Sequence, residues 1–591
     1  MADVPGINDE PFRIIVRSLR AMRAGDRGTS IVVTGEPGSG KTHLLGRLRN
    51  RLEQDERDGK GETVYVYVRC QASASTLWRH VQQALASDLL KPMTAGVSRL
   101  DSILRHHPER LEKVRHLSLR RVLERLRDGQ QFHVASAWLR GELVPDADLQ
   151  ALGVAVENDE EDRGREYESR RLIEAILRFT APTPTVLCFD QVEALETYRG
   201  DEAGFHAMGQ LVAWLINEFE HVLAISCVVN DYEAIFEKLP NKADRDRWLQ
   251  YKSTLRPIEW DHALELVKVR LDAAPALAAA RKARPDDALW PLDPADLKPL
   301  FEKTGLCLPR TLIQTCKQLF DALVGDDEPR PKRTREEFLQ EEYESRLAQA
   351  RAAVQKQGGD KTLDECLPWL LETCRLAPLG QGGERSQYAS RAYRGPGGDT
   401  ALVFCYQRGN RLTNRLRKIE RHWKAGTLRL KILRDLSIKP GRVAEAILTG
   451  LKNRGAKEVY PLPEALAALQ AIRDLRATAL SGELTEDGIP VSEQEVTAWA
   501  LNNLPPQVEQ LREELVSETA DEEDPRVSKL SELVNERKII AADAAARELS
   551  LSVDEVSDLA RRHPLRFGFL AGPPVVVFEA VEGPGAEHPR A

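Results

Sequence analysis

The sequence predicts an α/β fold: a domain built on a parallel sheet, followed by a smaller basic α/β domain and a C-terminal winged helix. Three observations predict the first of these domains. The apolar run Ile31–Val33 leads directly into a glycine-rich loop and a helix, a second strand-like run follows at Thr63–Val68, and a third, Thr185–Asp190, ends in an acid. Because helical patterns separate these strands, we expect a parallel sheet with right-handed crossovers.

The segment Gly35–Thr42 is typical of a loop that binds a polyphosphate. Its glycines let the backbone turn sharply and come close to the ligand, so that several amide N–H groups point at one anion. The helix that begins near Lys41 adds the positive end of its dipole. We expect a polyphosphate here, with the Lys41 ammonium on its β- and γ-phosphates and the Thr42 hydroxyl on Mg²⁺. The expected nucleotide-binding residues are Gly35, Glu36, Pro37, Gly38, Ser39, Gly40, Lys41, Thr42 and His43.

Two further strands end in polar residues that suit phosphate chemistry. The run Thr185–Asp190 would present Asp190 at its carboxyl end, where ligands bind in open α/β sheets. We expect Asp190 to orient Mg²⁺ or its water, and Glu193 to polarise the attacking water. The strand His221–Val229 ends at Asn230, which either contacts the γ-phosphate and water or is an ordinary turn residue.

Length and composition exclude several classes of protein. At 591 residues the chain should form roughly three to five compact units. Its net charge of −8 means that any nucleic-acid contact must come from a local basic surface. No apolar run approaches the roughly 20 residues of a membrane span, and residues 1–10 lack a signal-peptide pattern, so we expect no membrane contact and a cytoplasmic protein. The 8 cysteines form no C-x-x-C pair, which predicts reduced core residues without a metal.

The rest of the first half is mostly helical in pattern. A charged insertion covers about 94–164, a short strand is expected around Leu255–Glu259, and residues 261–323 have helical spacing. Within them Arg310 opens a helix and is placed to fold over the phosphates from a lid. Arg247 either reaches the nucleotide of a neighbouring subunit or lies on a solvated helix end.

With these features in this order, residues 1–325 resemble the AAA+ ATPases. They are similar to the initiator group, which includes the origin-recognition proteins and related bacterial DNA-loading ATPases, through the strand end Arg69-Cys70-Gln71 and the lid turn Gly305–Arg310. The resemblance implies a Mg²⁺-dependent ATPase with a P-loop base and a helical lid, and a homo-oligomer in ATP. Its implied site roles are a Walker A motif at Gly35–Thr42, a Walker B motif at Asp190 with Glu193 nearby, sensor 1 at Asn230, sensor 2 at Arg310 and an arginine finger within Arg245–Arg247.

Two segments also resemble other ATPases. Gln191 stands where an acid usually follows the metal-binding aspartate, and Asp190–Glu193 is similar to the STAND signalling ATPases. The segment Trp138–Glu142 is similar to one in ATPases encoded with bacterial phage-exclusion (BREX-type) systems, which implies a role in defence.

The expected domain boundaries follow from composition and turn signals. We expect an ATPase base at 1–256, a lid at 257–325, a linker helix at 326–358, a basic α/β domain at 359–482, a helical and acidic linker at 483–525, a winged helix-turn-helix at 526–582 and a disordered tail at 583–591.

The basic domain is the expected DNA-binding surface. Residues 408–434 contain 10 Lys or Arg against one acid, Glu420. On a helix, Arg411, Arg415 and Lys418 fall on one stripe that can follow a phosphate backbone, with Arg421 as a further candidate. The alternative is a solvated helix face.

The same domain also fits a restriction-endonuclease-like core, because a helix, the strand Ala401–Tyr406, the basic helix and the strand Leu428–Leu433 follow one another. Such nucleases need an acid and then an E-x-K pair. Asp399 is available, but Cys405–Arg408 stands at the position of the pair, which argues against cleavage.

The last unit has the pattern of a winged helix-turn-helix. Its third helix begins at Ser552 with Glu555 three residues later, a capping box. Acids occupy the positions that would read bases, and Arg561 and Arg562 lie only at the far end. Phosphate contact or protein docking therefore fits as well as sequence reading.

Together these features favour an ATPase whose nucleotide state controls engagement of double-stranded DNA. The first alternative is a STAND-like signalling or scaffold ATPase that switches assembly with a protein partner of the same system. The second is a DNA nuclease with an ATPase motor.

Overall fold

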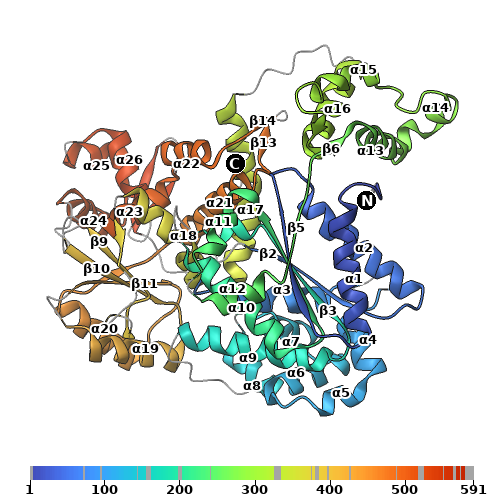
Figure 1. Cartoon of the computed structure of the whole chain (residues 1–591). Coiled ribbons are helices and arrows are strands. Elements are labelled where there is room, and N and C mark those ends of the chain that lie inside the picture. Colours follow the sequence, from blue (N-terminus) through green and yellow to red (C-terminus); the bar gives the residue numbers. More distant parts are fainter. Residues whose placement is uncertain are drawn as a thin grey trace.

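A computed structural model describes most of the chain (Figure 1). The described residues are 4–70, 74–92, 96–142, 144–154, 162–196, 202–239, 241–324, 334–357, 359–374, 376–379, 385, 387–395, 398–424, 428–486, 489–516, 525–549, 551–562, 567–570, 572 and 574–579. Gln71, the acidic linker 518–524 and the tail 583–591 lie outside them.

A parallel five-stranded sheet forms the centre of the first domain, as predicted. Its strands are β1 (Thr29–Gly35), β2 (Val64–Arg69), β3 (Thr185–Asp190), β4 (Val222–Val229) and β5 (Tyr251–Thr254), in the order β2-β3-β4-β1-β5. Gly35 pairs with Val229, and Asp190 pairs with Arg69. The ends of β1, β3 and β4 therefore meet at one edge of the sheet.

The short strand expected around Leu255–Glu259 is present as β6 (Ile258–Glu259), which pairs with β7 (Leu306–Cys307) in the lid. The fifth strand of the central sheet, β5 (Tyr251–Thr254), was not predicted. β5 is an edge strand with mostly exposed polar residues, so it carries no apolar run that a sequence pattern would reveal.

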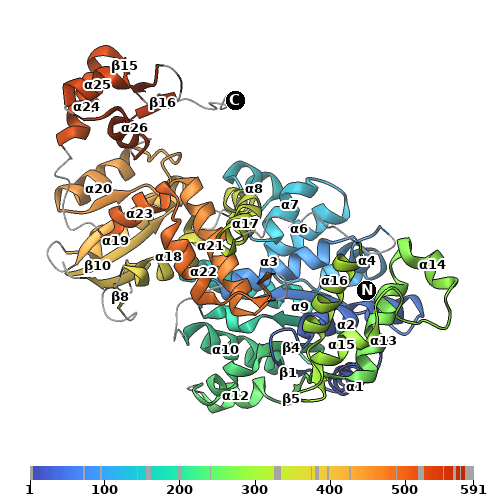
Figure 2. The same ribbon diagram turned by 90° about the horizontal axis from the view of Figure 1, so that it is seen from above.

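Helices cover both faces of this sheet (Figure 2). Val33 faces a core formed with α1 (Asp9–Arg23) and α2 (Lys41–Arg57), and the adjacent Val32 faces the opposite core. That opposite core contains α3 (Leu77–Leu90), α9 (Asp162–Thr180) and α10 (Ala203–Glu218). The alternation is the two-residue period of a strand buried on both sides.

The predicted insertion is helical and packs on the second of these cores. Its helices are α4 (Arg99–His106), α5 (Pro108–Glu112), α6 (Leu117–Arg127), α7 (Phe132–Leu139) and α8 (Asp146–Leu152). Beyond β4 lie α11 (Glu233–Glu237) and α12 (Lys242–Trp248), and the lid contains α13 (Trp260–Asp272), α14 (Ala278–Lys282), α15 (Pro294–Leu297) and α16 (Pro309–Val324) around its own core.

The middle domain has a five-stranded mixed sheet in the order β12-β11-β10-β9-β8. The strands are β8 (Ala377–Pro378), β9 (Arg391–Gly395), β10 (Gly398–Cys405), β11 (Arg429–Arg434) and β12 (Lys457–Val459), flanked by α18 (Gly359–Thr373), α19 (Gly409–His422), α20 (Arg442–Asn453) and α21 (Pro463–Leu480). Helices expected in linkers share its core: α17 (Arg335–Gln357), α22 (Glu493–Asn502) and α23 (Pro506–Val516). A small hairpin, β13 (Thr485–Glu486) and β14 (Ile489–Pro490), follows α21.

The last unit has the predicted helices and wing. It contains α24 (Pro525–Arg537), α25 (Ala542–Leu549), α26 (Val553–Arg562), β16 (Phe567–Leu570) and β17 (Val576–Glu579), with an additional strand β15 (Ile539–Ala541) beside β17. The capping box is confirmed, because Glu555 N donates to Ser552 Oγ at 3.2 Å and Ser552 N donates to Glu555 Oε2 at 2.7 Å.

Candidate functional site

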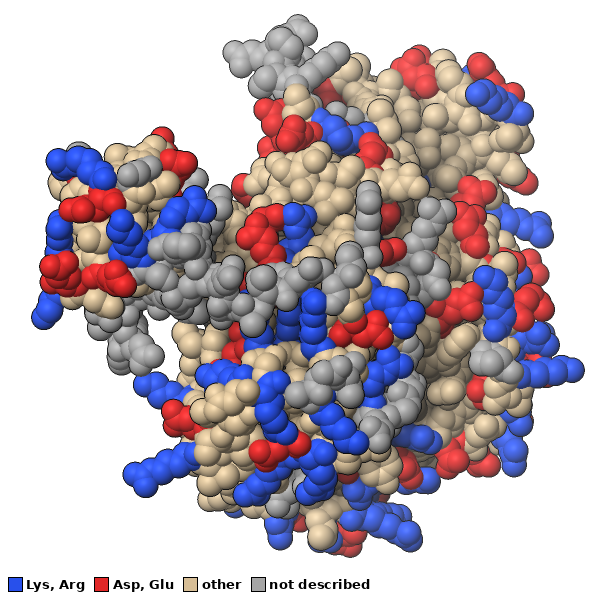
Figure 3. All heavy atoms as spheres, turned by 90° about the vertical axis from the view of Figure 1, so that its left-hand side faces the viewer, with Lys and Arg blue, Asp and Glu red and all other residues tan. Residues whose placement is uncertain are grey.

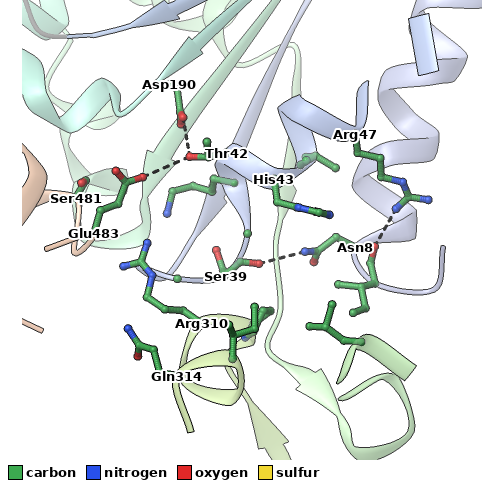
Figure 4. Close-up of a pocket in the computed structure, with 18 of the residues that line it drawn as sticks. Asn8, Ser39, Thr42, His43, Arg47, Asp190, Arg310, Gln314, Ser481 and Glu483 are labelled. Carbon is green, nitrogen blue, oxygen red and sulfur yellow. Dashed lines mark hydrogen bonds between the residues drawn. The ribbon is translucent and has the colours of Figure 1, made fainter. Parts of the chain in front are cut away.

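A cavity of about 390 Å³ lies at the edge where β1 and β3 end (Figure 4). Three parts of the chain line it: the ATPase base with the predicted loop, the lid, and a turn of the middle domain. Its residues include Lys41, Thr42, His43, Asp190 and Glu193 from the base, Arg270, Arg310 and Gln314 from the lid, and Ser481, Glu483 and Thr485 from the turn.

The loop between β1 and α2 is shaped for an anion. Gly38 and Gly40 have φ of 86° and 102°, which side-chain-bearing residues rarely adopt. Lys41 is 8% exposed, and its ammonium donates to the loop's own carbonyls, to Gly35 O at 2.8 Å and to Glu36 O at 3.1 Å. Burial lowers the pKa of Lys41. The buried hydroxyl of Ser39 has no hydrogen-bond partner in the described structure, so the loop offers an unused donor to a phosphate.

Thr42 and Asp190, the two predicted Mg²⁺ ligands, are in direct contact. The Thr42 hydroxyl donates to Asp190 Oδ2 at 2.7 Å, and the Tyr67 hydroxyl donates to the same oxygen at 2.8 Å. Hydroxyl and carboxylate oxygens are the ligands that Mg²⁺ prefers. Sequence reasoning missed Tyr67, although the two-residue period of β2 places it on the same face as Tyr65 and Arg69, beside β3.

Glu193 is fully buried at the inner wall of the cavity. Val229 N donates to its Oε2 at 3.3 Å, and its Oε1 has no partner in the described structure. Burial is the main cause that raises the pKa of Glu193 to about 7. A carboxyl with that pKa can accept a proton near neutral pH.

Of the residues with predicted catalytic roles, Asn230 and Arg247 do not line this cavity, and neither do Gly35, Glu36 and Pro37 of the predicted loop. Asn230 begins a short turn at the end of β4 and is partly buried, with its Oδ1 unpaired in the described structure. Arg247 is exposed near the end of α12, and the neighbouring Arg245 pairs with Glu237 at 3.4 Å. Their implied roles as sensor 1 and arginine finger remain predictions.

The lid brings Arg310 directly to the phosphate loop. Arg310 N donates to Gly38 O at 3.4 Å, and a Cβ on Gly38 would lie 2.9 Å from Arg310 Cβ. The Arg310 guanidinium donates to Gly482 O of the middle-domain turn. Gln314, one helical turn later, donates to Thr485 Oγ1 at 3.0 Å.

The turn Ser481–Thr485 is the main feature that sequence reasoning missed. Glu483 Oε1 lies 3.5 Å from Thr42 Oγ1, and its other oxygen lies 3.5 Å from the Arg69 guanidinium. Gln191 donates to Ser481 Oγ at 3.3 Å and accepts from Arg69 Nε at 2.7 Å. Thr42 and Glu483 are 441 positions apart, so no local pattern could indicate their contact.

The predicted basic stripe is not continuous. Arg415 is only 7% exposed and donates to Ser390 Oγ at 3.2 Å, because it lies on the apolar face of α19. Figure 3 shows Lys and Arg gathered on the lower part of the face that carries α19 and α20. Exposed members there are Arg408, Arg417, Arg421, Lys424 and Arg429, while Arg411 and Lys418 are half-buried.

The remaining predicted positions concern DNA contact by the winged helix, nuclease metal binding, the cysteines and membrane contact. The side chains of Arg561 and Arg562 lie outside the described part of the structure. Asp399 pairs with Arg394 at 3.0 Å, and no cluster of three or more His, Cys, Asp or Glu side chains among the described residues is arranged to hold a metal ion. All 8 cysteines are free thiols. No helix in the described ranges is long and apolar enough to cross a bilayer.

The comparisons with known proteins agree with this geometry for the first domain. Residues 9–225, which include the phosphate loop and Asp190, match the family model described as the AAA ATPase domain. No curated protein sequence matches the chain.

Several solved structures are similar at low identity. The Aeropyrum pernix ORC1 protein in complex with DNA is 13% identical, with a TM-score of 0.31 over 77% of this chain and 85% of that one. Drosophila ORC bound to DNA is 15% identical, with a TM-score of 0.25 over 60% of this chain and 69% of that one. Cdc6p from Pyrobaculum aerophilum is 10% identical, with a TM-score of 0.27 over 80% and 96% of the two chains.

Proposed function

We propose that this protein is a Mg²⁺-dependent ATPase of the AAA+ type whose nucleotide state controls how its basic middle domain engages double-stranded DNA. One observation carries the proposal: the cavity at the phosphate loop is lined by the ATPase base, the lid and the middle domain together. A ligand in that cavity therefore contacts or displaces groups from all three.

Nucleotide binding uses groups already oriented at the end of the sheet. The loop amides, the Ser39 hydroxyl and the Lys41 ammonium bind the phosphates, and Thr42 with Asp190 holds Mg²⁺. A Mg²⁺ ion held there would supply positive charge to the phosphate oxygens. Glu193 accepts the proton of the attacking water, because its carboxyl is buried at the wall of the same cavity.

DNA engagement uses the exposed cations of α19 and its flanks. In a chain of net charge −8, this face concentrates positive charge where a phosphate backbone can be neutralised. The contact positions the duplex without reading its sequence. In the winged helix, the exposed acids Asp554 and Glu555 at the start of α26 repel the same backbone, so this unit contributes less.

The proposed function includes assembly of several subunits in the presence of ATP. Arg247 is exposed on α12, where a neighbouring subunit in an ATP-bound oligomer can receive it. A role in anti-phage defence rests only on the segment Trp138–Glu142. The structure gives that segment a packing role, since Leu139 O accepts from Gln82 at 3.0 Å and Arg140 pairs with Glu142 at 2.7 Å.

A second candidate function is the signalling or scaffold ATPase, and Gln191 favours it. Instead of an acid beside Asp190, the chain has an amide that bridges Arg69 of the base and Ser481 of the middle domain. Such a site suits slow turnover and long-lived states, with a protein partner in place of DNA.

One experiment separates these functions: the ATPase rate and the oligomer mass are measured together, with and without duplex DNA. We expect Mg²⁺-dependent hydrolysis that changes when DNA is added, and loss of it in Asp190→Asn. If neither the ATPase rate nor the oligomer mass changes when DNA is added at low salt, the result would contradict the proposed function and favour the protein-partner switch.

A further inference from the structure

We propose that the turn Ser481–Thr485 is a latch that closes over the phosphate loop in the nucleotide-free protein and that a bound nucleoside triphosphate releases. The inference rests on the proposed function, because it assumes that the cavity binds a triphosphate. It goes further by naming the segment of the middle domain that detects the phosphates. Figure 4 shows Glu483, from the turn, and Arg310, from the lid, side by side next to the loop.

The latch is held by groups that a triphosphate also needs. The Arg310 guanidinium, placed to fold over the phosphates, donates instead to Gly482 O. The Thr42 hydroxyl, placed to bind Mg²⁺, lies between Asp190 Oδ2 at 2.7 Å and Glu483 Oε1 at 3.5 Å. The one hydrogen of this hydroxyl goes to the nearer Asp190 oxygen, so the Glu483 carboxylate occupies the space beside the expected Mg²⁺ ligand without a strong bond to it.

The negative charge of Glu483 also opposes binding of the phosphates. Glu483 brings a carboxylate to a cavity whose expected ligand is a polyanion. The Arg69 guanidinium, 3.5 Å from Glu483, partly neutralises the charge of that carboxylate, and Arg69 also donates to Gln191. Arg69 therefore ties the turn to the end of β2 and does not itself contact the phosphates. In a cavity of low dielectric, two like charges at short range repel each other strongly.

The contact between the turn and the loop is also tight. A Cβ on Gly482 would lie 2.3 Å from Pro37 Cβ, and Gly482 has a φ of +67°. Only glycine fits there without displacing the turn. Any movement of the phosphate loop around a ligand is therefore transmitted to the end of α21.

A second set of contacts limits how far the release spreads. Arg473, in the middle of α21, pairs with Glu365 of α18 at 2.7 Å. Glu365 in turn accepts from Thr76, at the start of α3 in the base, at 2.8 Å. Since Thr76 and Glu365 are buried, the Arg473 side chain is only 12% exposed and the three are mutually paired, they keep α21 on the base. We therefore expect release at the turn and the β13–β14 hairpin, while the two domains remain docked.

The first test is hydrogen exchange of the full chain without DNA, with Mg²⁺ and either no nucleotide or a non-hydrolysable ATP analogue. We expect the analogue to speed exchange of amides in 481–486 while slowing exchange in the loop 35–42. Slower or unchanged exchange in the turn, with the loop protected, would overturn the latch.

The second test measures affinity for the analogue in two variants that open the latch by different routes. Glu483→Gln removes the competing charge, and Gly482→Ala adds a Cβ that collides with Pro37. If the latch is closed in most molecules, each variant should bind the triphosphate up to about tenfold more tightly, because the binding-competent fraction rises. A nucleoside monophosphate should show a smaller gain.

Glu486→Gln is the matched control. Glu486 lies on the same hairpin but pairs with Arg335 at 2.8 Å and does not line the cavity, so its affinity should equal that of the wild type. Equal or weaker binding by Glu483→Gln would overturn the latch alone. A wild-type protein that binds no nucleotide would instead overturn the proposed function, and the latch with it.

Discussion

The Thr42 hydroxyl donates a 2.7 Å hydrogen bond to Asp190 Oδ2, which joins the first turn of α2 to the end of β3. Tyr67 donates to the same carboxylate oxygen at 2.8 Å. Two donors from different elements thus fix the orientation of Asp190 before a ligand arrives. This is the preorganisation that a magnesium site requires.

Replacing Tyr67 by Phe should therefore weaken the magnesium site without removing a ligand. We expect the Mg²⁺ concentration for half-maximal ATPase activity to rise by roughly 10- to 100-fold. Tyr65→Phe is the matched control, because the Tyr65 hydroxyl donates to Leu45 O at 3.1 Å and has no contact with Asp190. Equal Mg²⁺ dependence in the two variants would show that Tyr67 does not position Asp190.

Glu193 should give ATP hydrolysis a characteristic pH dependence. Its pKa is raised to about 7 by burial, and only the ionised form accepts a proton. The rate constant kcat should therefore rise with pH through about 7 and then level off. Glu193→Gln should lower kcat by roughly 10²- to 10⁴-fold while nucleotide still binds. Near-normal turnover in that variant would assign the water-activating role elsewhere.

The exposed position of Arg247 predicts a shared active site between subunits. Lys41→Ala lacks a phosphate ligand, and Arg247→Ala lacks the group that would reach a neighbour. Mixing the two inactive proteins should restore part of the ATPase rate. Some subunit interfaces then combine an intact Lys41 from one variant with an intact Arg247 from the other. A strictly monomeric mass in ATP, with no rescue, would count against this prediction.

The α19 face should dominate the salt dependence of DNA binding. Each Lys or Arg on phosphate lowers the slope of log affinity against log salt by about 0.9. Neutralising Arg408, Arg417 and Arg421 together should therefore flatten the slope by about 2 to 3 units if all three contact phosphate.

The matched control for this variant is a triple change of the same charge on α1, where Arg13, Arg17 and Arg20 are also exposed. We expect that control to leave the slope almost unchanged. Equal slopes in both triple variants would identify the α19 face as a solvated surface.

The sequence predicted those elements whose determinants are local. A few neighbouring residues are enough to indicate the conformation of β1, β3, β4 and the phosphate loop, through apolar runs in the strands and glycines in the loop. From these runs the parallel sheet was predicted, and Thr42 and Asp190 were expected at the same Mg²⁺ ion. β5 was not predicted, because an exposed edge strand needs no apolar pattern.

Arg415 could have been placed correctly from the sequence. Leu412, Leu416 and Ile419 repeat at helical spacing and define the buried face of α19, and Arg415 falls between them. The charge pattern alone led to the wrong face. The contact of Glu483 with Thr42 is different in kind, because it depends on how two domains dock and has no local signal.

If nucleotide state controls DNA engagement, the affinity for DNA must differ between nucleotide states. The affinity of the full chain for a duplex of unrelated sequence is measured at one fixed salt concentration without nucleotide, with ADP, and with a non-hydrolysable ATP analogue. Lys41→Ala is measured in parallel. We expect the wild-type affinity to differ between the nucleotide-free and triphosphate states by about tenfold or more, the size of an ordinary allosteric coupling, and the difference to vanish in Lys41→Ala. Equal affinities in all three wild-type states, with nucleotide binding shown in the same samples, would contradict the account.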